Sequence, residues 1–86
     1  MLNQVSFQVE DIFSIMGRGI VVTGQLSSGF IKKGMKTVIN GKQSEILSIE
    51  SKNQSLESLN AGTPAGLLLS NIKKDDIVKG NILSFQ

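Results

Sequence analysis

Short runs of β-branched and aromatic residues, each followed by a turn signal, constrain the fold of this chain more than any other feature. Val5, Phe7 and Val9 alternate with polar residues, which is the period of a half-buried strand. Residues 20–23 (IVVT) are β-branched throughout and predict a strand buried on both faces, or nearly so. No long stretch keeps a helical period. The pattern therefore predicts an all-β fold, either a barrel or a sandwich.

Turn signals separate these runs. Asn40-Gly41 lies between two strand-like runs and is the preferred pair for a two-residue type I′ hairpin. Gly17-Arg18-Gly19 predicts a tight turn, because glycine adopts positive φ without strain. The apolar alternation shifts phase after Val9, and a bulge or bend near Glu10 and Asp11 would explain the shift.

Gly24 interrupts an apolar strand and predicts a bend or a close approach of another backbone segment. The second half of the chain predicts four elements, in order: a polar loop at 51–55, a core strand at 65–69 that begins at Pro64, at most one helical turn near 73–78, and a closing strand at 81–85.

Composition excludes several classes of function. The chain has 86 residues, enough for one domain and too few for two, so we expect a single domain over residues 1–86. It contains no cysteine and no histidine, which excludes disulfides, thiolate nucleophiles and histidine-based metal sites. No nucleophile–base pair is recognisable. We therefore expect no enzymatic activity, no metal and no cofactor.

The sequence also bears on location. The N-terminal residues lack a basic segment followed by a long apolar run, so they do not predict a signal peptide. The longest apolar stretch, residues 65–69, is far shorter than the ~20 residues that span a bilayer. We expect a cytoplasmic protein with no membrane partner.

An ordered set of motifs resembles one family. The motifs are residues 9–15 (VEDIFSI), 17–19 (GRG), 21–24 (VVTG), 28–29 (SG), 31–34 (IKKG), 61–62 (AG), 66–69 (GLLL), 72–77 (IKKDDI) and 80–83 (GNIL). Their order and spacing resemble domain 2 of elongation factor Tu and related translational GTPases, over roughly residues 5–84. The resemblance implies a closed six-stranded Greek-key barrel, which in the full-length factor lies beside a GTPase domain.

The GTPase motif itself is absent from this chain. No GxxxxGK[ST] occurs, since Gly41-Lys42 is followed by Gln43 and the preceding glycine is missing. We therefore expect no GTP binding. Two interpretations stay open: a complete small protein, which Met1 and the short flanks favour, or a domain excised from a longer translational GTPase.

The resemblance also implies a pocket for the aminoacyl end of a charged tRNA. The residues that match the family pattern by position are Glu10, Asp11, Phe13 and Thr23. The positions that depart from it include Ile20, Lys52, Asn53, Pro64, Ser70 and Asn71. Losing the family's asparagine and arginine leaves ligand groups unpaired, at about 1–3 kcal/mol each. We expect tight aminoacyl-tRNA binding by this chain alone to be lost.

Each matching residue also has a purely structural interpretation. Glu10 and Asp11 would form an exposed bulge, Phe13 would lie in the core, and Thr23 would pack in its strand. Whether these four residues line a pocket therefore depends on which of the two interpretations the folded structure supports.

Basic residues point to a second class of partner. Arg18 would pair with a phosphate or carboxylate through its planar guanidinium. Lys32, Lys33 and Lys36, with Phe13 as a stacking surface, would carry RNA binding, although all four cations also suit solvated turns. The net charge of +2 permits such a partner without requiring it. We expect a non-catalytic binding module whose partner is a protein or, alternatively, tRNA or ribosomal RNA.

Overall fold

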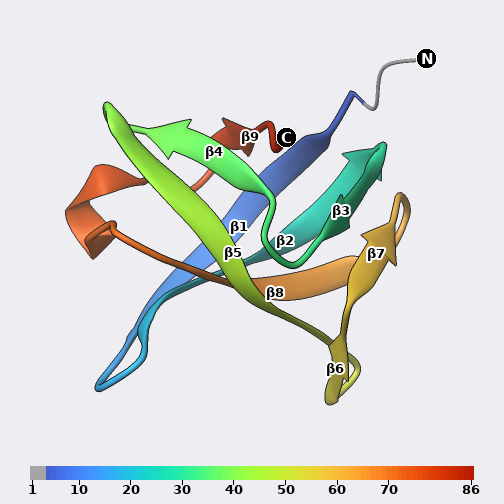
Figure 1. The fold of residues 1–86 in the computed structure, drawn as a ribbon, viewed down its shortest axis with the longest axis horizontal. Helices are drawn as coiled ribbons and strands as arrows, with labels where there is room; N and C mark the ends of the chain where they lie inside the picture. Colours follow the sequence, from blue (N-terminus) through green and yellow to red (C-terminus); the bar gives the residue numbers. More distant parts are fainter. Residues whose placement is uncertain (1–3) are drawn as a thin grey trace.

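The structure is a computed structural model that describes residues 4–86, and within this range it consists of strands with one 3₁₀ turn (Figure 1). In chain order the strands are β1 (Ser6–Ile15), β2 (Gly19–Ser28), β3 (Phe30–Lys32), β4 (Lys36–Ile39), β5 (Lys42–Ser51), β6 (Gln54–Leu56), β7 (Ser58–Asn60), β8 (Pro64–Leu69) and β9 (Ile82–Leu83). The 3₁₀ turn η1 spans Lys74–Asp76. The all-β prediction, with one helical turn near residues 73–78, is confirmed.

Six antiparallel strands follow one another around the barrel in the order β4-β5-β8-β2-β1-β9. β8 returns to lie between β2 and β5, which gives the Greek-key arrangement. The two ends of this order meet at one residue pair. The Lys36 N–H donates to the Gln86 carbonyl (2.7 Å), and the Gln86 N–H donates to the Lys36 carbonyl (2.8 Å). The sheet is therefore a nearly closed six-stranded barrel, as the resemblance implied.

The three remaining strands extend or cover this barrel. β6 continues from β5 through a tight turn and pairs with it from Ile49 to Ser51. β3 and β7 pair only with each other. Their central residues, Ile31 and Leu59, are both buried in the core, so this small ladder covers part of the barrel interior.

The local turn predictions are confirmed. Asn40 and Gly41 have φ angles of 52° and 77°, and positive φ at both positions is what a type I′ turn requires. Ile39 pairs with Lys42 on either side of that turn. The β1–β2 register shifts between Val9 and Asp11, which places the predicted bulge at Glu10.

Gly24 marks a close backbone approach, as predicted. It pairs with Val9 across the β1–β2 ladder. A Cβ at this position would overlap the carbonyl oxygen of Gln8 and lie 3.0 Å from the Phe7 ring. Only glycine fits here without moving the neighbouring strand.

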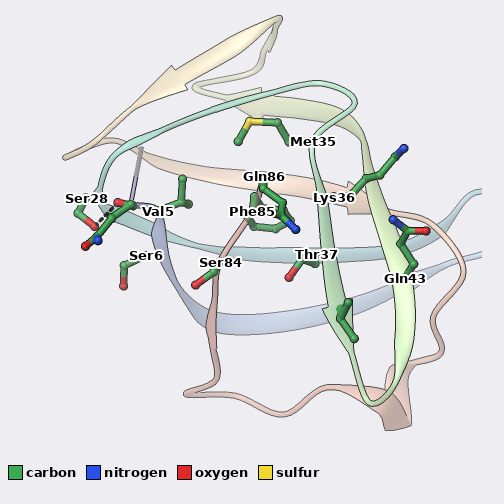
Figure 2. Close-up of a pocket in the computed structure, with 12 residues that line it drawn as sticks. Val5, Ser6, Ser28, Met35, Lys36, Thr37, Gln43, Ser84, Phe85 and Gln86 are labelled. Carbon is green, nitrogen blue, oxygen red and sulfur yellow. Dashed lines mark hydrogen bonds between the residues drawn. The ribbon is translucent and has the colours of Figure 1, made fainter. Parts of the chain in front are cut away.

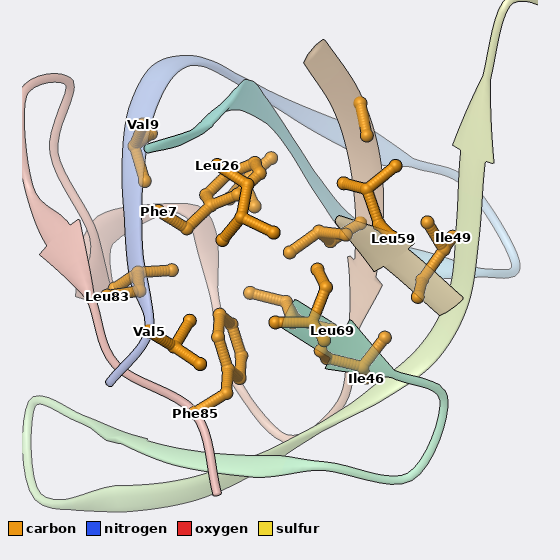
Figure 3. Packing of buried hydrophobic residues seen from close by; sticks show 14 of the residues in the cluster. Val5, Phe7, Val9, Leu26, Ile46, Ile49, Leu59, Leu69, Leu83 and Phe85 are labelled. Carbon is orange, nitrogen blue, oxygen red and sulfur yellow. The ribbon is translucent and has the colours of Figure 1, made fainter. Parts of the chain in front are cut away.

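Alternate residues of the long strands fill the barrel (Figure 3). The most deeply buried side chains come from five strands: Phe7, Val9, Val22, Leu26, Ile31, Ile46, Ile49, Leu67 and Leu69. Because protein interiors are close-packed, each large buried side chain contributes substantially to the stability of the fold. The side chains that alternate with these on β1, β2, β5 and β8 lie on the outer surface of the barrel.

η1 is fixed to the β4–β5 hairpin by the side chain of Asp76. Its carboxylate accepts hydrogen bonds from Lys42 Nζ (2.8 Å), the Lys73 backbone N–H (2.8 Å) and Asn40 Nδ2 (2.9 Å). The bond from Lys42, followed by those from Lys73 and Asn40, holds the pKa of Asp76 well below its usual value of 3.8. The carboxylate is therefore charged at neutral pH and joins segments far apart in the sequence.

Two predictions were wrong in detail. Residues 51–55 are not a loop, because only Lys52 and Asn53 turn the chain between β5 and β6. Both adopt positive φ (53° and 64°), which asparagine tolerates but which sequence patterns do not predict for lysine. The closing strand is also shorter than predicted, since β9 covers only Ile82–Leu83.

Candidate functional site

A row of paired residues crosses four strands on the outer surface of the barrel. Asp11 of β1 pairs with Thr23 of β2, which pairs with Gly66 of β8, which pairs with Glu50 of β5. The neighbouring strand positions point into the core, so these residues face outward. The row brings four segments of the sequence together at one place.

A pocket of about 420 Å³ lies over this row. Its lining residues are Glu10, Val21, Thr23, Gly24, Glu50, Ser51, Lys52, Asn53, Pro64, Ala65 and Gly66. Gly66 lies at the base of the depression. A Cβ added there would meet Val21 Cγ1 at 3.6 Å and Thr23 Cγ2 at 3.8 Å, which is ordinary contact. The lining of the pocket therefore includes a position at which β8 has no side chain.

The charge of the pocket is acidic on balance. Glu10 and Glu50 both line it and are exposed, and neither forms an ion pair with a residue between 4 and 86. Lys52 is the single basic residue of the lining. A group with positive charge or hydrogen-bond donors suits this site better than a phosphate.

Lys52 and Asn53 form the tight turn at one side of the pocket. Lys52 has a φ of 53°, a left-handed conformation that costs a residue with a Cβ about 1–2 kcal/mol. Pairing of Ser51 with Gln54 on either side holds the turn in place. This turn carries two of the positions at which the sequence departs from the family pattern.

The pocket contains two of the four matching residues, Glu10 and Thr23. Asp11 is a neighbour of Thr23 in the row but is absent from the lining. Its Oδ1 accepts a hydrogen bond from the Ile12 N–H (2.9 Å) and lies 3.5 Å from Lys79 Nζ. The hydrogen bond from Ile12, with the Lys79 ammonium, lowers the pKa of Asp11.

Phe13 lies on the outer surface, and its alternative placement in the core is wrong. It is 44% exposed and pairs with Val21, which in turn pairs with Leu68. Ile15, two residues further along β1, is also exposed. We call these four residues (Phe13, Ile15, Val21 and Leu68) the outer apolar patch, of which Phe13 and Ile15 are exposed, Val21 is half-buried and Leu68 is buried. It lies directly beside the pocket, with Val21 common to both.

The predicted cationic residues do not form one surface. Arg18 lies in the turn before β2, whereas Lys32 and Lys33 follow the far end of the same strand. A strand of this length spans roughly 30 Å at the usual rise of about 3.3 Å per residue. Figure 1 shows the β1–β2 turn and β3 on opposite sides of the molecule.

Two of these cations also have close neighbours. Lys32 Nζ lies 5.9 Å from the centre of the Phe30 ring, and Lys33 Nζ lies 3.8 Å from Glu57. Arg18 remains at the opposite end of β2, so no concentrated positive field arises from this set.

Sequence reasoning missed Glu50, Val21 and Gly66 as site residues. Their proximity depends on pairing between β5, β8 and β2, which no local pattern encodes. Only Gly66, a glycine inside an apolar strand, gave a signal, because such a residue often marks a close approach or a gap.

Within residues 4–86 no group of three or more acidic side chains is arranged to hold a metal ion. The same part of the chain has no helix that is long and apolar enough to cross a membrane. Neither finding assigns a function, and the pocket with its apolar patch remains the strongest candidate site.

Comparison with known proteins agrees with this architecture. The structure is similar to that of the translation elongation factor SelB from Methanococcus maripaludis, in its apo form, with a TM-score of 0.89 and 25% sequence identity. The similarity covers 96% of this chain and 18% of the SelB chain, so this chain spans about a fifth of that factor's length. The family profile described as elongation factor Tu domain 2 matches residues 19–84. The chain therefore belongs to the elongation factor Tu domain 2 family.

Proposed function

We propose that this chain is a non-catalytic, cytoplasmic binding module of the translation-factor type, and that it docks on a protein partner through the outer face of β1, β2, β8 and β5. One observation carries the proposal: the outer apolar patch, with Phe13 and Ile15 exposed, lies beside a pocket with two carboxylates that have no ion-pair partner in the described chain. Apolar surface next to a charged rim is typical of protein interfaces.

The distribution of charge supports a protein partner over RNA. The carboxylates of Glu10 and Glu50 would repel a phosphate backbone at the pocket. Arg18 and Lys32, which would attract it, lie at opposite ends of β2. A lysine or arginine side chain or an amino group of the partner would instead meet Glu10 and Glu50.

Binding of a tRNA end is the second candidate, and one observation favours it. Glu10 and Thr23, both matched to the family's aminoacyl pocket by position, line one pocket together. The same pocket contains Lys52, Asn53 and Pro64, where the family pattern is lost. This candidate therefore predicts weak binding, and it applies equally to a domain of a longer translational GTPase.

Two matched phenylalanines allow a direct test. Phe13 and Phe30 are exposed to nearly the same extent, 44% and 41%, but lie on β1 and β3. Replacing each in turn by the photo-reactive analogue p-benzoylphenylalanine places a crosslinker inside or outside the proposed interface. We expect a protein adduct in cells from position 13 only, and expect RNase treatment to leave it intact. The adduct should decrease when Glu10 and Glu50 are both changed to glutamine.

A titration with tRNA at two salt concentrations decides between the candidates. Micromolar binding that weakens steeply with salt would support the RNA interpretation, because release of counterions makes such binding salt-dependent. An RNase-sensitive adduct at position 13, or equal adducts at positions 13 and 30, would overturn the protein-docking proposal.

A further inference from the structure

The seam where β4 meets the C-terminal segment (residues 84–86) is held by a single residue pair. Lys36 and Gln86 exchange both backbone hydrogen bonds. If the two antiparallel strands continued in the same register, Val38 would be opposite Ser84 and would form the next hydrogen-bonded pair. That pair is not formed, so the strands separate immediately after the first contact.

The backbone groups of Val38 point into this seam. In an antiparallel ladder, alternate residues direct their N–H and C=O to opposite neighbours. Ile39 and Lys42 close the two-residue turn of the β4–β5 hairpin, so Ile39 bonds toward β5 and Val38 points away from it. Neither seam-facing group of Val38 has a backbone partner within residues 4–86.

Ser84 lies on the other edge of the seam, in the C-terminal segment. The Val9 N–H donates to the Asn81 carbonyl (2.9 Å), so Asn81 faces β1, and Leu83 pairs with Phe7 on the same side. Alternation then directs Ser84 and Gln86 toward β4. Gln86 bonds to Lys36, whereas Ser84 has no such backbone partner in the described chain.

A pocket of about 960 Å³ lies at this seam, within the size range of small-ligand sites. Its lining residues are Gln4, Val5, Ser6, Ser28, Met35, Lys36, Thr37, Val38, Gln43, Ser84, Phe85 and Gln86. Figure 2 shows the C-terminal segment inside it, with Ser6 and Ser84 on one side and Thr37 and Gln43 on the other. Both open edges therefore border the same space.

The side chain of Thr37 adds a hydroxyl group to this pocket. Thr37 is only 8% exposed and lines the pocket, and no residue between 4 and 86 hydrogen-bonds to its hydroxyl. Every fully buried polar side-chain atom in this part of the chain has a partner. The Thr37 oxygen is therefore reached from the pocket, where a bound group would complete its hydrogen bonding.

We propose that the seam binds an extended peptide segment, which enters as a strand between β4 and the C-terminal segment beyond the Lys36–Gln86 pair, where the two edges are not bonded to each other. Its backbone would pair with the free N–H and C=O of Val38 on one edge and of Ser84 on the other. Strand addition of this kind draws affinity from main-chain hydrogen bonds. The site is separate from the outer face in the proposed function, and neither proposal depends on the other.

The residues that line the pocket at the seam also indicate what kind of peptide would bind there. Lys36 is the single charged side chain of the pocket, and no acidic side chain between residues 4 and 86 pairs with it. Val5, Met35 and Phe85 supply apolar surface. The fitting segment is therefore an extended peptide with small apolar and hydroxyl side chains and one carboxylate near Lys36.

The probe is the capped peptide acetyl-Glu-Val-Thr-Val-Thr-Val-amide, titrated into the full chain and followed by amide NMR. Two N-methylated versions each block the hydrogen bonds along one edge of the peptide and leave the protein unchanged. Val38→Pro removes the seam-facing N–H, which the β4–β5 ladder does not use. We expect shifts at Thr37, Val38, Ser84 and Gln86, and binding at least about tenfold weaker for each blocked peptide and for the variant.

Three results would overturn the proposal. One is the absence of shifts at the seam at millimolar peptide. Another is equal binding of the parent and the N-methylated peptides, which would mean that the backbone is not recognised. The third is hydrogen exchange at Val38 and Ser84 in the free protein as slow as at Val22, because the seam would then already be closed.

Discussion

The β1–β2 ladder and the seam between β4 and the C-terminal segment join neighbouring strands of one barrel, but to very different degrees. β1 and β2 are paired along their whole length and meet through a short turn. The seam exchanges backbone hydrogen bonds only between Lys36 and Gln86. Closing the hairpin orders few residues, whereas closing the seam orders a long segment, and loop-closure entropy rises with that length. The paired side stabilises the fold, and the seam leaves polar backbone for other contacts.

Core truncations should show the largest effect and test this asymmetry. Phe7→Ala removes a fully buried ring on β1, and we expect a loss of about 3–5 kcal/mol in the free energy of unfolding. Phe85→Ala removes a buried ring beside the seam, where the open pocket lets the chain adjust, and we expect about 1–2 kcal/mol less. Urea unfolding followed by circular dichroism measures both. Equal losses would contradict the asymmetry.

Two glycines give the next contrast. Gly24→Ala places a Cβ against the Gln8 carbonyl, so β1 and β2 must separate locally, and we expect a loss of up to about 3 kcal/mol in the free energy of unfolding. Gly66→Ala meets only atoms at ordinary contact distance, and we expect a change within about 0.5 kcal/mol. The second variant also fills the base of the outer pocket, so it should weaken partner binding without unfolding the chain. If the Gly24→Ala variant were as stable as the wild-type chain, the close approach of β1 and β2 at this position would be disproved.

Asp76 tests the connection from η1 to the β4–β5 hairpin. Its folded pKa is lowered by hydrogen bonds from Lys42, Lys73 and Asn40, so its contribution to stability is complete above its usual pKa of 3.8. That contribution is lost as the pH falls below this value toward the folded pKa. We expect Asp76→Asn to have a Tm several degrees lower at pH 7, and expect the difference from wild type to shrink between pH 4 and pH 2. Thermal scans at each pH measure it, and a constant difference would exclude this role.

The exposed pair of Lys33 and Glu57 should have the smallest effect. Its atoms are 3.8 Å apart and both side chains are accessible to solvent, so water and salt screen the attraction. We expect Glu57→Gln to change the free energy of unfolding by less than about 0.5 kcal/mol. A larger loss would mean that the β3–β7 ladder depends on this contact. The same urea titration distinguishes this outcome from the small change expected.

Local chemistry was predictable from the sequence wherever neighbours in the chain decide the conformation. The Asn40-Gly41 hairpin, the bulge at Glu10 and the close approach at Gly24 were all predicted correctly. Lys52-Asn53 was missed, because pairing of β5 with β6 imposes a conformation that lysine alone disfavours. Glu10 and Thr23 were predicted for one pocket, but Glu50 and Gly66 reach it only through the β5–β8 ladder.

The sequence by itself determined the strand class, the main turns and the family, because alternation, glycines and β-branched runs act over a few residues. Tertiary structure decided which outward residues share a surface. It placed Phe13 beside Val21 and not in the core, and it separated Arg18 from Lys32 by the length of β2. It also left Val38 and Ser84 unpaired across the seam. The physical reason is that strand register is fixed by the burial of whole faces, and burial is a property of the assembled barrel.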